Sequence, residues 1–405
     1  MKAPSAIFLC LSFLLLVACS KDPVEKVEPE KTYTFFPRIR VTDPNNEVEV
    51  IVSTASGKVL FDSVVFSNID ASVKFSSNEK RFNFTYISYS VSERKYLAVT
   101  YRSVDPTNWD TLSPWFGYRM PPIYFESTPF TSGRLTLTNT PTGSPYFSCY
   151  VGSSSTAIGG IGSNTLVVSY QRRNGLPVFI NFPKEGLHKV FTPTSDNETV
   201  DLSQLAKSVK LPWGFPAGFA PLTAFAHGLI DTTNIEKTLR LAGAPDPDFL
   251  IYPPTGFQKY SWASSAENKL TGEKILHYSF GDSIVRPGNF LTKDNFELSS
   301  STDTDFRIRF VGQKPYMYVS EWEDTELNWI IYSPADSGSI QPLTMLKGWK
   351  PKRLSNTTIN SLRLKRIFME RSEQNSFDDA MSRFHVSAVR NKPRYLVINR
   401  YEKSF

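Results

Sequence analysis

Short segments of alternating aromatic and β-branched residues recur along this chain and constrain its fold more than any other feature. Residues 81–91 read RFNFTYISYSV, and residues 95–104 read KYLAVTYRSV. Alternation with a period of two places every second side chain on one face of a strand, and Phe, Tyr, Val and Ile favour such a pleated, half-buried surface. Aromatic residues make up 14% of the chain, and its 28 prolines mark loops and strand edges. The pattern predicts an all-β protein.

Strand-like segments of this kind, separated by polar turns, fill the chain from residue 32 onward. Their spacing of about 10 to 15 residues is typical of antiparallel β-sandwiches of the immunoglobulin-like kind. Breaks in the series divide the chain into three such domains in tandem. We place them at residues 32–130, 131–245 and 246–405, and we expect the last to be the largest.

Four segments have specific local expectations: one loop, two short helical segments and one further strand. Small and flexible residues predict a long exposed hairpin loop at residues 152–164. Capping residues predict a short helix starting in residues 201–206 and one helical turn at residues 376–381. Residues 383–389, RFHVSAV, are expected to return to a strand.

The first residues have the pattern of a secretion signal. Met1 and Lys2 give a short positive start, and residues 6–18 then run apolar. As a helix this run would be about 20 Å long, too short for a bilayer core of about 30 Å. We therefore expect residues 1–18 to be a signal peptide that is removed and takes no part in the fold.

The signal ends in residues 16–19, LVAC, which resembles the lipobox of bacterial lipoproteins. That resemblance implies cleavage before Cys19 and attachment of lipid to its sulfur and to the new amino group. Two or three acyl chains hold a protein firmly on a membrane. Residues 19–31 then read as the lipidated cysteine and a disordered, acidic tether.

This tether is similar to the acidic export tag of surface lipoproteins in Bacteroidota. The similarity covers about ten residues, of which Asp22, Glu25, Glu28 and Glu30 carry the charge. It implies an outer-membrane protein that faces the outside of the cell. A tether that is acidic by chance, on a protein facing the periplasm, is the alternative.

Charge and cysteine content limit the kinds of partner that the protein can bind. Cys10 leaves with the signal and Cys19 carries lipid, so Cys149 is the one remaining thiol, and its aromatic strand context favours a small buried hydrophobe over a nucleophile. The formal net charge is +6, and residues 347–405 hold 14 Lys and Arg against 5 Asp and Glu. This basic region could face anionic glycans, lipopolysaccharide or a protein, or be an ordinary solvated surface. Nucleic acid is not expected as a partner outside the cell.

No motif for catalysis or for metal binding stands out. The 4 histidines lie far apart in the sequence, and there is no HExxH or GxSxG pattern. We therefore expect a protein that is not an enzyme and has no cofactor and no metal ion. Glu321 and Glu323 flank Trp322 as glycosidase carboxylates could, but strand alternation would give them a polar face. Acidic turns form two candidate calcium loops, which ordinary turn chemistry also explains: Asp303 with Asp305, and Asp196, Asn197, Glu198 and Asp201.

Clusters of aromatic residues give the best indication of a ligand. They contain Trp109, Trp115 and Tyr118, then Trp213, then Trp322 and Trp329. A sugar ring has an apolar C–H face that can lie on an aromatic ring while neighbouring polar groups bond its hydroxyls. We take these residues as candidate ligand-binding platforms. The alternative is burial, since most Trp side chains in a sandwich fill the core.

Taken together, the lipobox, the acidic tether and the tandem sandwiches resemble uncharacterised surface lipoproteins of Bacteroidota. Some accessory lipoproteins of starch-utilisation-type systems share this plan and bind glycans without cleaving them. The resemblance implies a non-catalytic outer-membrane lipoprotein that binds extracellular glycan through exposed aromatics. The alternative is an adhesin or structural envelope subunit that binds a protein partner, for which open strand edges would serve.

Overall fold

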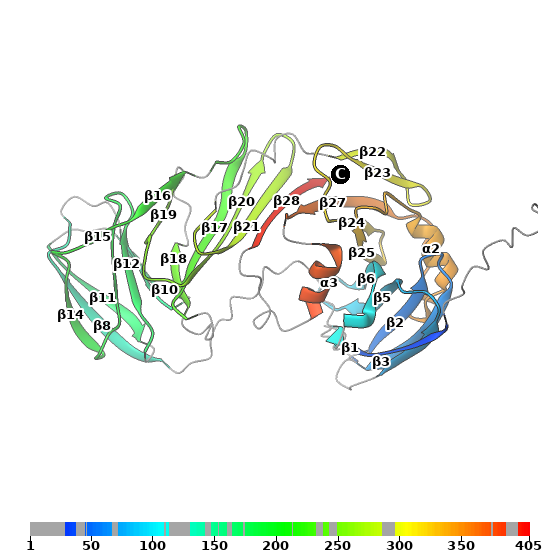
Figure 1. Cartoon of the computed structure of the whole chain (residues 1–405), viewed down its shortest axis with the longest axis horizontal. Helices are drawn as coiled ribbons and strands as arrows, with labels where there is room; N and C mark the ends of the chain where they lie inside the picture. Colours follow the sequence, from blue (N-terminus) through cyan, green and yellow to red (C-terminus); the bar gives the residue numbers. More distant parts are fainter. Residues whose placement is uncertain are drawn as a thin grey trace, which may run out of the picture.

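The computed structural model of the chain describes residues 29–37, 45, 47–66, 72–108, 111–112, 130–141, 147–152, 154–159, 164–172, 175–212, 214–231, 238–242, 249–285, 296–373, 376–385 and 396–405. These residues are nearly all β, which confirms the predicted fold class of sandwich-type sheets. Figure 1 shows one long curved sheet with smaller sheets against it. Within the described residues, no helix is long and apolar enough to cross a bilayer.

The long sheet has 12 strands and joins parts of the chain that lie far apart in sequence. In spatial order it comprises β18 (Thr238–Ala242), β17 (Ala220–Leu229), β20 (Lys259–Asn268), β21 (Glu273–Gly281), β28 (Leu396–Ser404), β27 (Arg363–Arg371), β24 (Met317–Glu323), β25 (Leu327–Pro334), β6 (Lys95–Val104), β5 (Phe82–Ser90), β2 (Glu47–Thr54) and β3 (Val59–Phe66). Neighbours pair antiparallel, except that β25 and β6 run parallel. The sheet thus crosses the expected domain ranges, since β6, β17 and β25 come from three different ranges.

A second unit is a true two-layer sandwich. One layer comprises β10 (Ser154–Gly159), β9 (Phe147–Val151), β12 (Val178–Phe182), β13 (Leu187–Phe191) and β15 (Ala206–Lys207). The other comprises β11 (Thr165–Arg172), β8 (Thr131–Thr138) and β14 (Asn197–Asp201). Apolar side chains such as Leu137, Cys149 and Ile180 fill the space between the layers. The burial of Cys149 agrees with its expected role as a small hydrophobe.

Smaller elements cover the long sheet on both faces. The strands are β1 (Lys31–Pro37), β4 (Val73–Ser77) and β7 (Thr111–Leu112), then β22 (Phe296–Ser301), β23 (Phe306–Phe310) and β26 (Ser339–Ile340), and the ribbon β16 (Val209–Pro212) with β19 (Phe249–Tyr252). The helices are α2 (Pro342–Trp349) and α3 (Phe377–His385), with short 3-10 turns η1 (Pro106–Asn108) and η4 (Lys352–Leu354).

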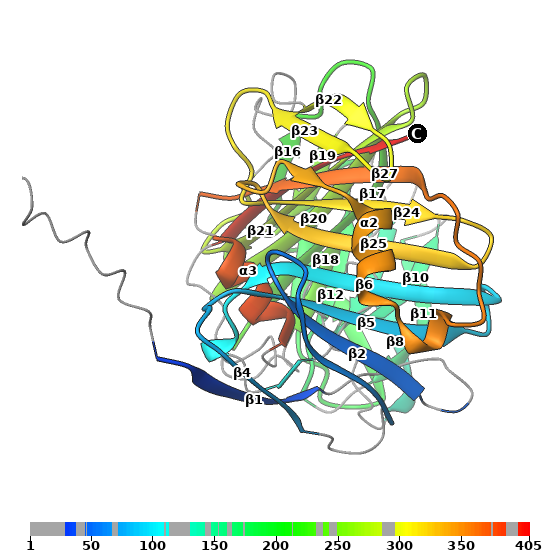
Figure 2. The same cartoon turned by 90° about the vertical axis from the view of Figure 1, so that its right-hand side faces the viewer.

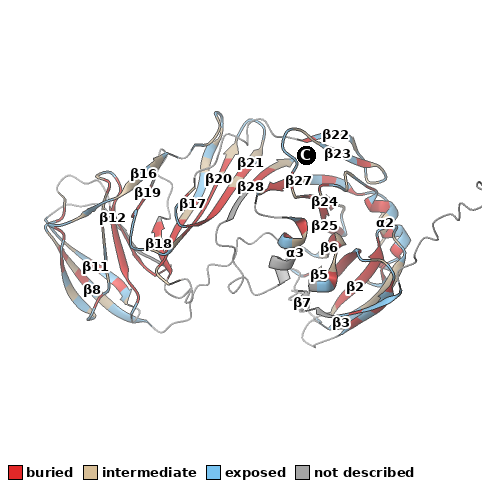
Figure 3. Ribbon diagram, in the orientation of Figure 1, coloured by how far each residue is buried: buried red, intermediate tan, exposed pale blue. Residues whose placement is uncertain are grey.

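The two faces of the long sheet have separate cores. On the inner face, Tyr33 and Phe75 of the β1 sheet and Met381 of α3 pack onto the strands, and α3 lies within the curve of the sheet in Figure 1. On the outer face, the β22 sheet and α2 cover Trp322 and Trp329. Figure 2 shows α2 lying across this face, and Figure 3 shows buried residues running along the long strands. Most strands of the long sheet are therefore buried on both sides.

Helix α2 was not predicted from the sequence, and its packing explains it. Pro342 occupies the first turn, where its missing N–H costs nothing. Leu343, Leu346 and Trp349 form the buried stripe, and the helix ends at Lys350, which adopts the left-handed conformation with φ of 50°. Tertiary burial of this stripe makes a short helix stable where local pattern alone would not.

Three local expectations need correction. Residues 154–159 form strand β10 on β9 and are not an exposed loop, since Ser, Thr and Ala fit an edge strand. No helix starts at 201–206, where β14 ends and β15 follows. The helical turn expected at 376–381 is confirmed, but α3 continues to His385 and replaces the start of the strand expected at 383–389.

Candidate functional site

Two of the predicted aromatic platforms are part of the core. Trp322 and Trp329 are both 0% exposed. The indole of Trp322 donates to Ser320 Oγ at 2.9 Å, and that of Trp329 donates to Thr100 Oγ1 at 2.8 Å. The prediction that these two rings bind a ligand is wrong, because α2 and the β22 sheet cover the face to which they point. Trp109, Trp115, Tyr118, Trp213 and Cys19 lie outside the described residues.

Strand alternation in β24 places Glu321 and Glu323 on the face opposite Trp322, as expected. Glu321 Oε2 accepts from Arg366 at 2.6 Å, and Lys365 Nζ lies 3.1 Å from Glu321 Oε1. Burial alone would raise the pKa of Glu323, but the bond from Arg363 and the charge of Lys365 outweigh it and lower that pKa. A glycosidase acid requires the opposite shift. The two carboxylates are suited to ion pairing across the sheet.

The acidic turns considered for calcium also have protein partners. Asp196 accepts from Arg172 at 2.9 Å and from Thr131 at 2.8 Å. Bonds from Asn139 and Ser203 lower the pKa of Asp201 to about 2. In the other turn, Asp303 Oδ2 accepts the N–H of Leu362 at 2.6 Å, and Asp305 pairs with Arg307 at 2.8 Å. These contacts are those of ordinary turns and surface pairs.

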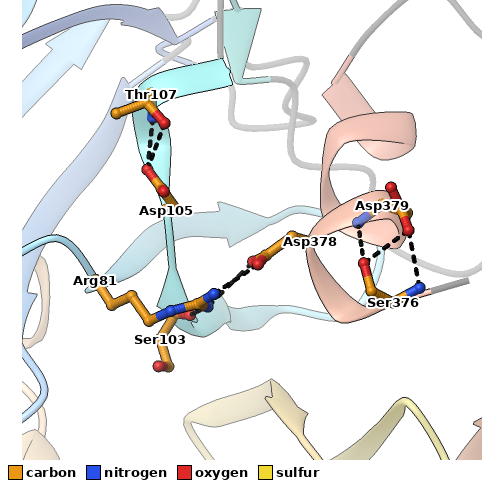
Figure 4. A network of polar contacts seen from close by, with 7 residues as sticks. All are labelled: Arg81, Ser103, Asp105, Thr107, Ser376, Asp378 and Asp379. Carbon is orange, nitrogen blue, oxygen red and sulfur yellow. Dashed lines mark hydrogen bonds and ion pairs between the residues drawn. The ribbon is translucent and has the colours of Figure 1, made fainter.

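A polar network fixes the start of α3 against the sheet (Figure 4). Arg81 donates to both carboxylate oxygens of Asp378, at 3.1 and 2.6 Å, and to the carbonyl of Ser103 at 2.7 Å. Ser376 and Asp379 cap the helix reciprocally, at 3.1 Å and 2.9 Å. A shallow depression of about 470 Å³ beside Arg81 includes Asn78, Glu79 and Lys80. Because Arg81 is already paired with Asp378, this depression offers little to an anionic ligand.

A smaller cleft of about 230 Å³ opens on the outer face of the five-stranded layer. It is lined by His188, Lys189, Val190, Gln204, Ala206, Thr255, Gly256 and Phe257. Ser208 Oγ holds His188 Nδ1 at 2.9 Å, and burial lowers the pKa of this histidine, so that the ring is neutral at pH 7. Within the described part of the chain, His188 Nε2 has no hydrogen-bond partner. The lining contains no carboxylate.

The end of the long sheet at β3 is an open strand edge among the described residues. Among the described residues, strand β3, which is 8 residues long, is the last in the sheet and pairs with β2 alone. Val64 and Phe66, on the face that also carries Glu47 and Glu49, are 37% and 49% exposed. No described strand pairs with the far side of β3. A long, partly apolar strand edge of this kind is a template for another strand.

One basic turn covers part of this edge. We use the term basic turn for Lys352 and Arg353, which begin η4 just after α2. Lys352 Nζ donates to the backbone carbonyl of Asp62 in β3 at 2.8 Å and lies 3.0 Å from its carboxylate. Arg353 Nη1 donates to Glu47 at 2.7 Å. A lysine on an edge strand is a common protection against unwanted pairing.

The carboxylate of Glu49 binds the backbone of the basic turn. Its two carboxylate oxygens accept the backbone N–H groups of Lys352 and Arg353, at 2.6 and 2.8 Å. Glu49 is 0% exposed. Burial raises its pKa to about 6, helped by contact with the Asp62 carboxyl and opposed by the two backbone bonds. Asp62 Oδ1 is itself buried without a hydrogen-bond partner.

The alternation of Glu47, Val48, Glu49 and Val50 is visible in the sequence and indicates a strand, but it does not show what the two carboxylates bind. The signal was available, since Glu49 stands in a strand whose other residues are largely buried. The Lys-Arg pair of the basic turn, which Glu49 binds, lies far along the chain: Glu49 and Lys352 are 303 residues apart in the sequence. Only the tertiary structure brings these charges together.

Comparison with known proteins adds little. No protein-family model and no curated protein matches the chain. Among solved structures, the crystal structure of the pilus adhesin SpaC from Lactobacillus rhamnosus GG is similar to it with a TM-score of 0.13 and 9% identity, over 76% of this chain and 44% of that chain. The chain therefore spans less than half the length of that adhesin, and so low a TM-score supports no conclusion about fold or function.

Proposed function

We propose that this chain is a non-catalytic envelope protein that binds an extended segment of a partner protein along the outer edge of β3. In this role it acts as an adhesin or as a structural subunit of the cell envelope. The single observation that carries the proposal is the unpaired far side of β3 among the described residues, at the end of a 12-stranded sheet. An added strand would extend that sheet by backbone hydrogen bonds.

The side chains of β3 indicate what such a segment should contain. Val64 and Phe66 point to the same face and remain partly exposed, so a partner strand with apolar residues at alternate positions would bury them. Strand addition draws affinity from the backbone and specificity from these alternating contacts. The partner is therefore an extended, partly apolar polypeptide.

The lipid anchor belongs to the same proposal. Lipid on Cys19 would hold the protein on the outer membrane, with the acidic tether between the anchor and β1. We propose that the protein faces the cell exterior, where an adhesin acts. Mass spectrometry of the native protein tests the anchor, since an unmodified thiol at Cys19 would contradict it.

Site-specific crosslinking tests strand addition. A photoreactive residue at Phe66 should crosslink to one partner protein in intact cells, and the same residue at Val167, an exposed position of β11, should not. Val64→Lys should abolish the adduct, because it places a charge where the partner's apolar residue packs, whereas Val167→Lys should leave it unchanged. Equal crosslinking from both positions, or an adduct insensitive to Val64→Lys, would refute the proposal.

Glycan binding is the second candidate, and the cleft at His188 favours it. Phe257 offers an apolar ring, while His188 Nε2, Gln204 and Thr255 offer hydrogen-bonding groups around it. Because the lining lacks a carboxylate, this cleft would bind a neutral sugar ring without cleaving it. At about 230 Å³ it has room for one ring of a longer glycan.

Calorimetric titration with neutral oligosaccharides, after an array screen, tests this second candidate. His188→Ala should weaken any binding by about tenfold, the value of one lost hydrogen bond. Gln313→Ala, on a distant loop, is the matched control. An array without a positive glycan, or binding that His188→Ala leaves intact, would exclude the cleft.

A further inference from the structure

We infer that buried Glu49 keeps a proton that it donates to Asp62 Oδ1 and that this contact forms a pH-dependent clasp, which holds the basic turn over the edge of β3 in mild acid and weakens at neutral pH. The clasp itself stands on the geometry below. Its meaning as a control of partner binding rests on the proposed function of β3.

The first observation is an unsatisfied buried oxygen next to a buried acid. Asp62 Oδ1 lacks a hydrogen-bond partner although it is inaccessible to solvent. The Glu49 carboxyl contacts the Asp62 carboxyl. Two ionised carboxylates offer only acceptors to each other, so both cannot be satisfied in this arrangement. A proton on Glu49 supplies the missing donor for Asp62 Oδ1 and closes the network.

The second observation is that the proton lies under the contacts that hold the turn. Glu49 is bonded to two successive backbone N–H groups, those of Lys352 and Arg353. Lys352 also covers the backbone carbonyl of Asp62, which belongs to the edge itself. Any movement that separates Glu49 from Asp62 therefore moves the turn away from β3.

The charged groups around Glu49 do not remove its preference for a proton. From β2 it faces Glu47 and from β3 it faces Asp62, both acidic. The basic side chains of the turn have carboxylates of their own: Lys352 pairs with Asp62, and Arg353 pairs with Glu47. On β5 the residue paired with Glu49 is the uncharged Ile87. Ionised Glu49 is thus left with the two backbone bonds and a repulsive neighbour.

The direction of the switch follows from linkage. The closed clasp binds the proton with a pKa of about 6, and an open clasp would restore the ordinary Glu value of 4.5. The closed form therefore gains over the open form as pH falls through 6, and it loses up to about 30-fold in relative population as pH rises to neutrality. The edge of β3 is therefore uncovered more often at neutral pH than in mild acid.

Hydrogen exchange of the Lys352 and Arg353 amides, read by mass spectrometry with residue-level fragmentation, reports the clasp directly. In the full chain, protection corrected for intrinsic rates should fall by about 8-fold between about pH 5 and about pH 7.5, since the full change of about 30-fold is reached only from well below pH 4.5. Glu49→Gln should remove this pH dependence, since it has no proton to lose. Asp62→Asn should keep protection high at both pH values, because the new amide donates to ionised Glu49.

Asp336→Asn is the matched control. Asp336 pairs with Lys314 far from β3, and its substitution should leave the pH dependence as in the wild type. Equal protection at the two pH values in the wild type would overturn the inference. A dependence that survives in Glu49→Gln would do the same.

The outcomes separate the clasp from the proposed function. Exchange is measured on the free protein, so it does not depend on any partner. If crosslinking at Phe66 fails while exchange follows pH, the partner role is wrong and the clasp stands. If crosslinking succeeds while exchange ignores pH, the edge binds its partner without this control.

Discussion

The burial of Trp329 gives the most demanding test of the structure, because from the sequence the same ring was a candidate ligand platform, with burial as the alternative. Trp329 lies in β25, is bonded to Thr100 of β6 at 2.8 Å, and packs edge-to-face on Trp349 of α2 at 5.7 Å between centroids. The Trp329 side chain thus connects the parallel strand pair β25 and β6 to helix α2, which packs on the sheet.

The cost of Trp329→Ala follows from these contacts. Emptying a buried Trp site costs about 3 to 5 kcal/mol, through lost burial and the cavity left behind. The lost indole bond adds about 1 kcal/mol, and this term is small because Thr100 Oγ1 keeps its bond to Thr85 at 2.8 Å. We expect the free energy of unfolding to fall by about 4 to 6 kcal/mol, a large part of the stability of an ordinary domain.

Urea denaturation followed by tryptophan fluorescence and circular dichroism measures this change. Leu270→Ala is the control, because Leu270 is 96% exposed and its loss should change stability by less than about 0.5 kcal/mol. A loss below about 2 kcal/mol for Trp329→Ala would refute the buried placement and would return this ring to the list of candidate platforms.

Three further outcomes are expected. Glu49 binds a proton more tightly in the folded state, so wild-type stability should fall by about 1.5 kcal/mol as pH rises from 4.5 to about 7, and a pH series of denaturation curves should show no such fall in Glu49→Gln. Burial raises the pKa of Cys149 to about 12, so a thiol reagent at about pH 8 should modify it only after denaturant is added; rapid labelling of the native protein would contradict this. Arg400→Met leaves Glu370 buried without its cation and should cost about 3 to 5 kcal/mol, much of it recovered in the double variant with Glu370→Gln; the same loss in both variants would contradict the pairing.

Local pattern predicted individual strands well. Residues 95–104 form β6 with the predicted bounds, and residues 81–91 contain β5. Period-two alternation is a property of the strand itself, so it can be read without knowledge of the neighbours. The same rule correctly put Glu321 and Trp322 on opposite faces.

The elements that pack against each face of a strand could not be predicted from this local pattern. The side of β24 that carries Trp322 is covered by α2 and by the β22 sheet, and no local pattern announces that cover. The local sequence around an exposed Trp does not differ from the local sequence around a Trp that another element covers. For that reason the platforms at Trp322 and Trp329 were mistaken.

The candidate site depends even more on distant pairing. The alternation of Glu47 and Glu49 is visible in the sequence, but the basic turn reaches them only because α2 ends above β2. The sheet order that leaves β3 at the edge is likewise set by the pairing of β6 with β25. Register between strands so far apart is a tertiary property.

The parallel pairing of β6 with β25 also has a consequence for how the protein is made. The first four strands of the long sheet in chain order, β2, β3, β5 and β6, cannot join β25 through β6 until the chain has been synthesised past Pro334, since β25 spans Leu327–Pro334. Contacts over such separations slow folding, and meanwhile β6 exposes an unpaired apolar edge of 10 residues. A nascent or truncated chain would therefore present this edge to other chains, and a prematurely ended copy would aggregate through β6.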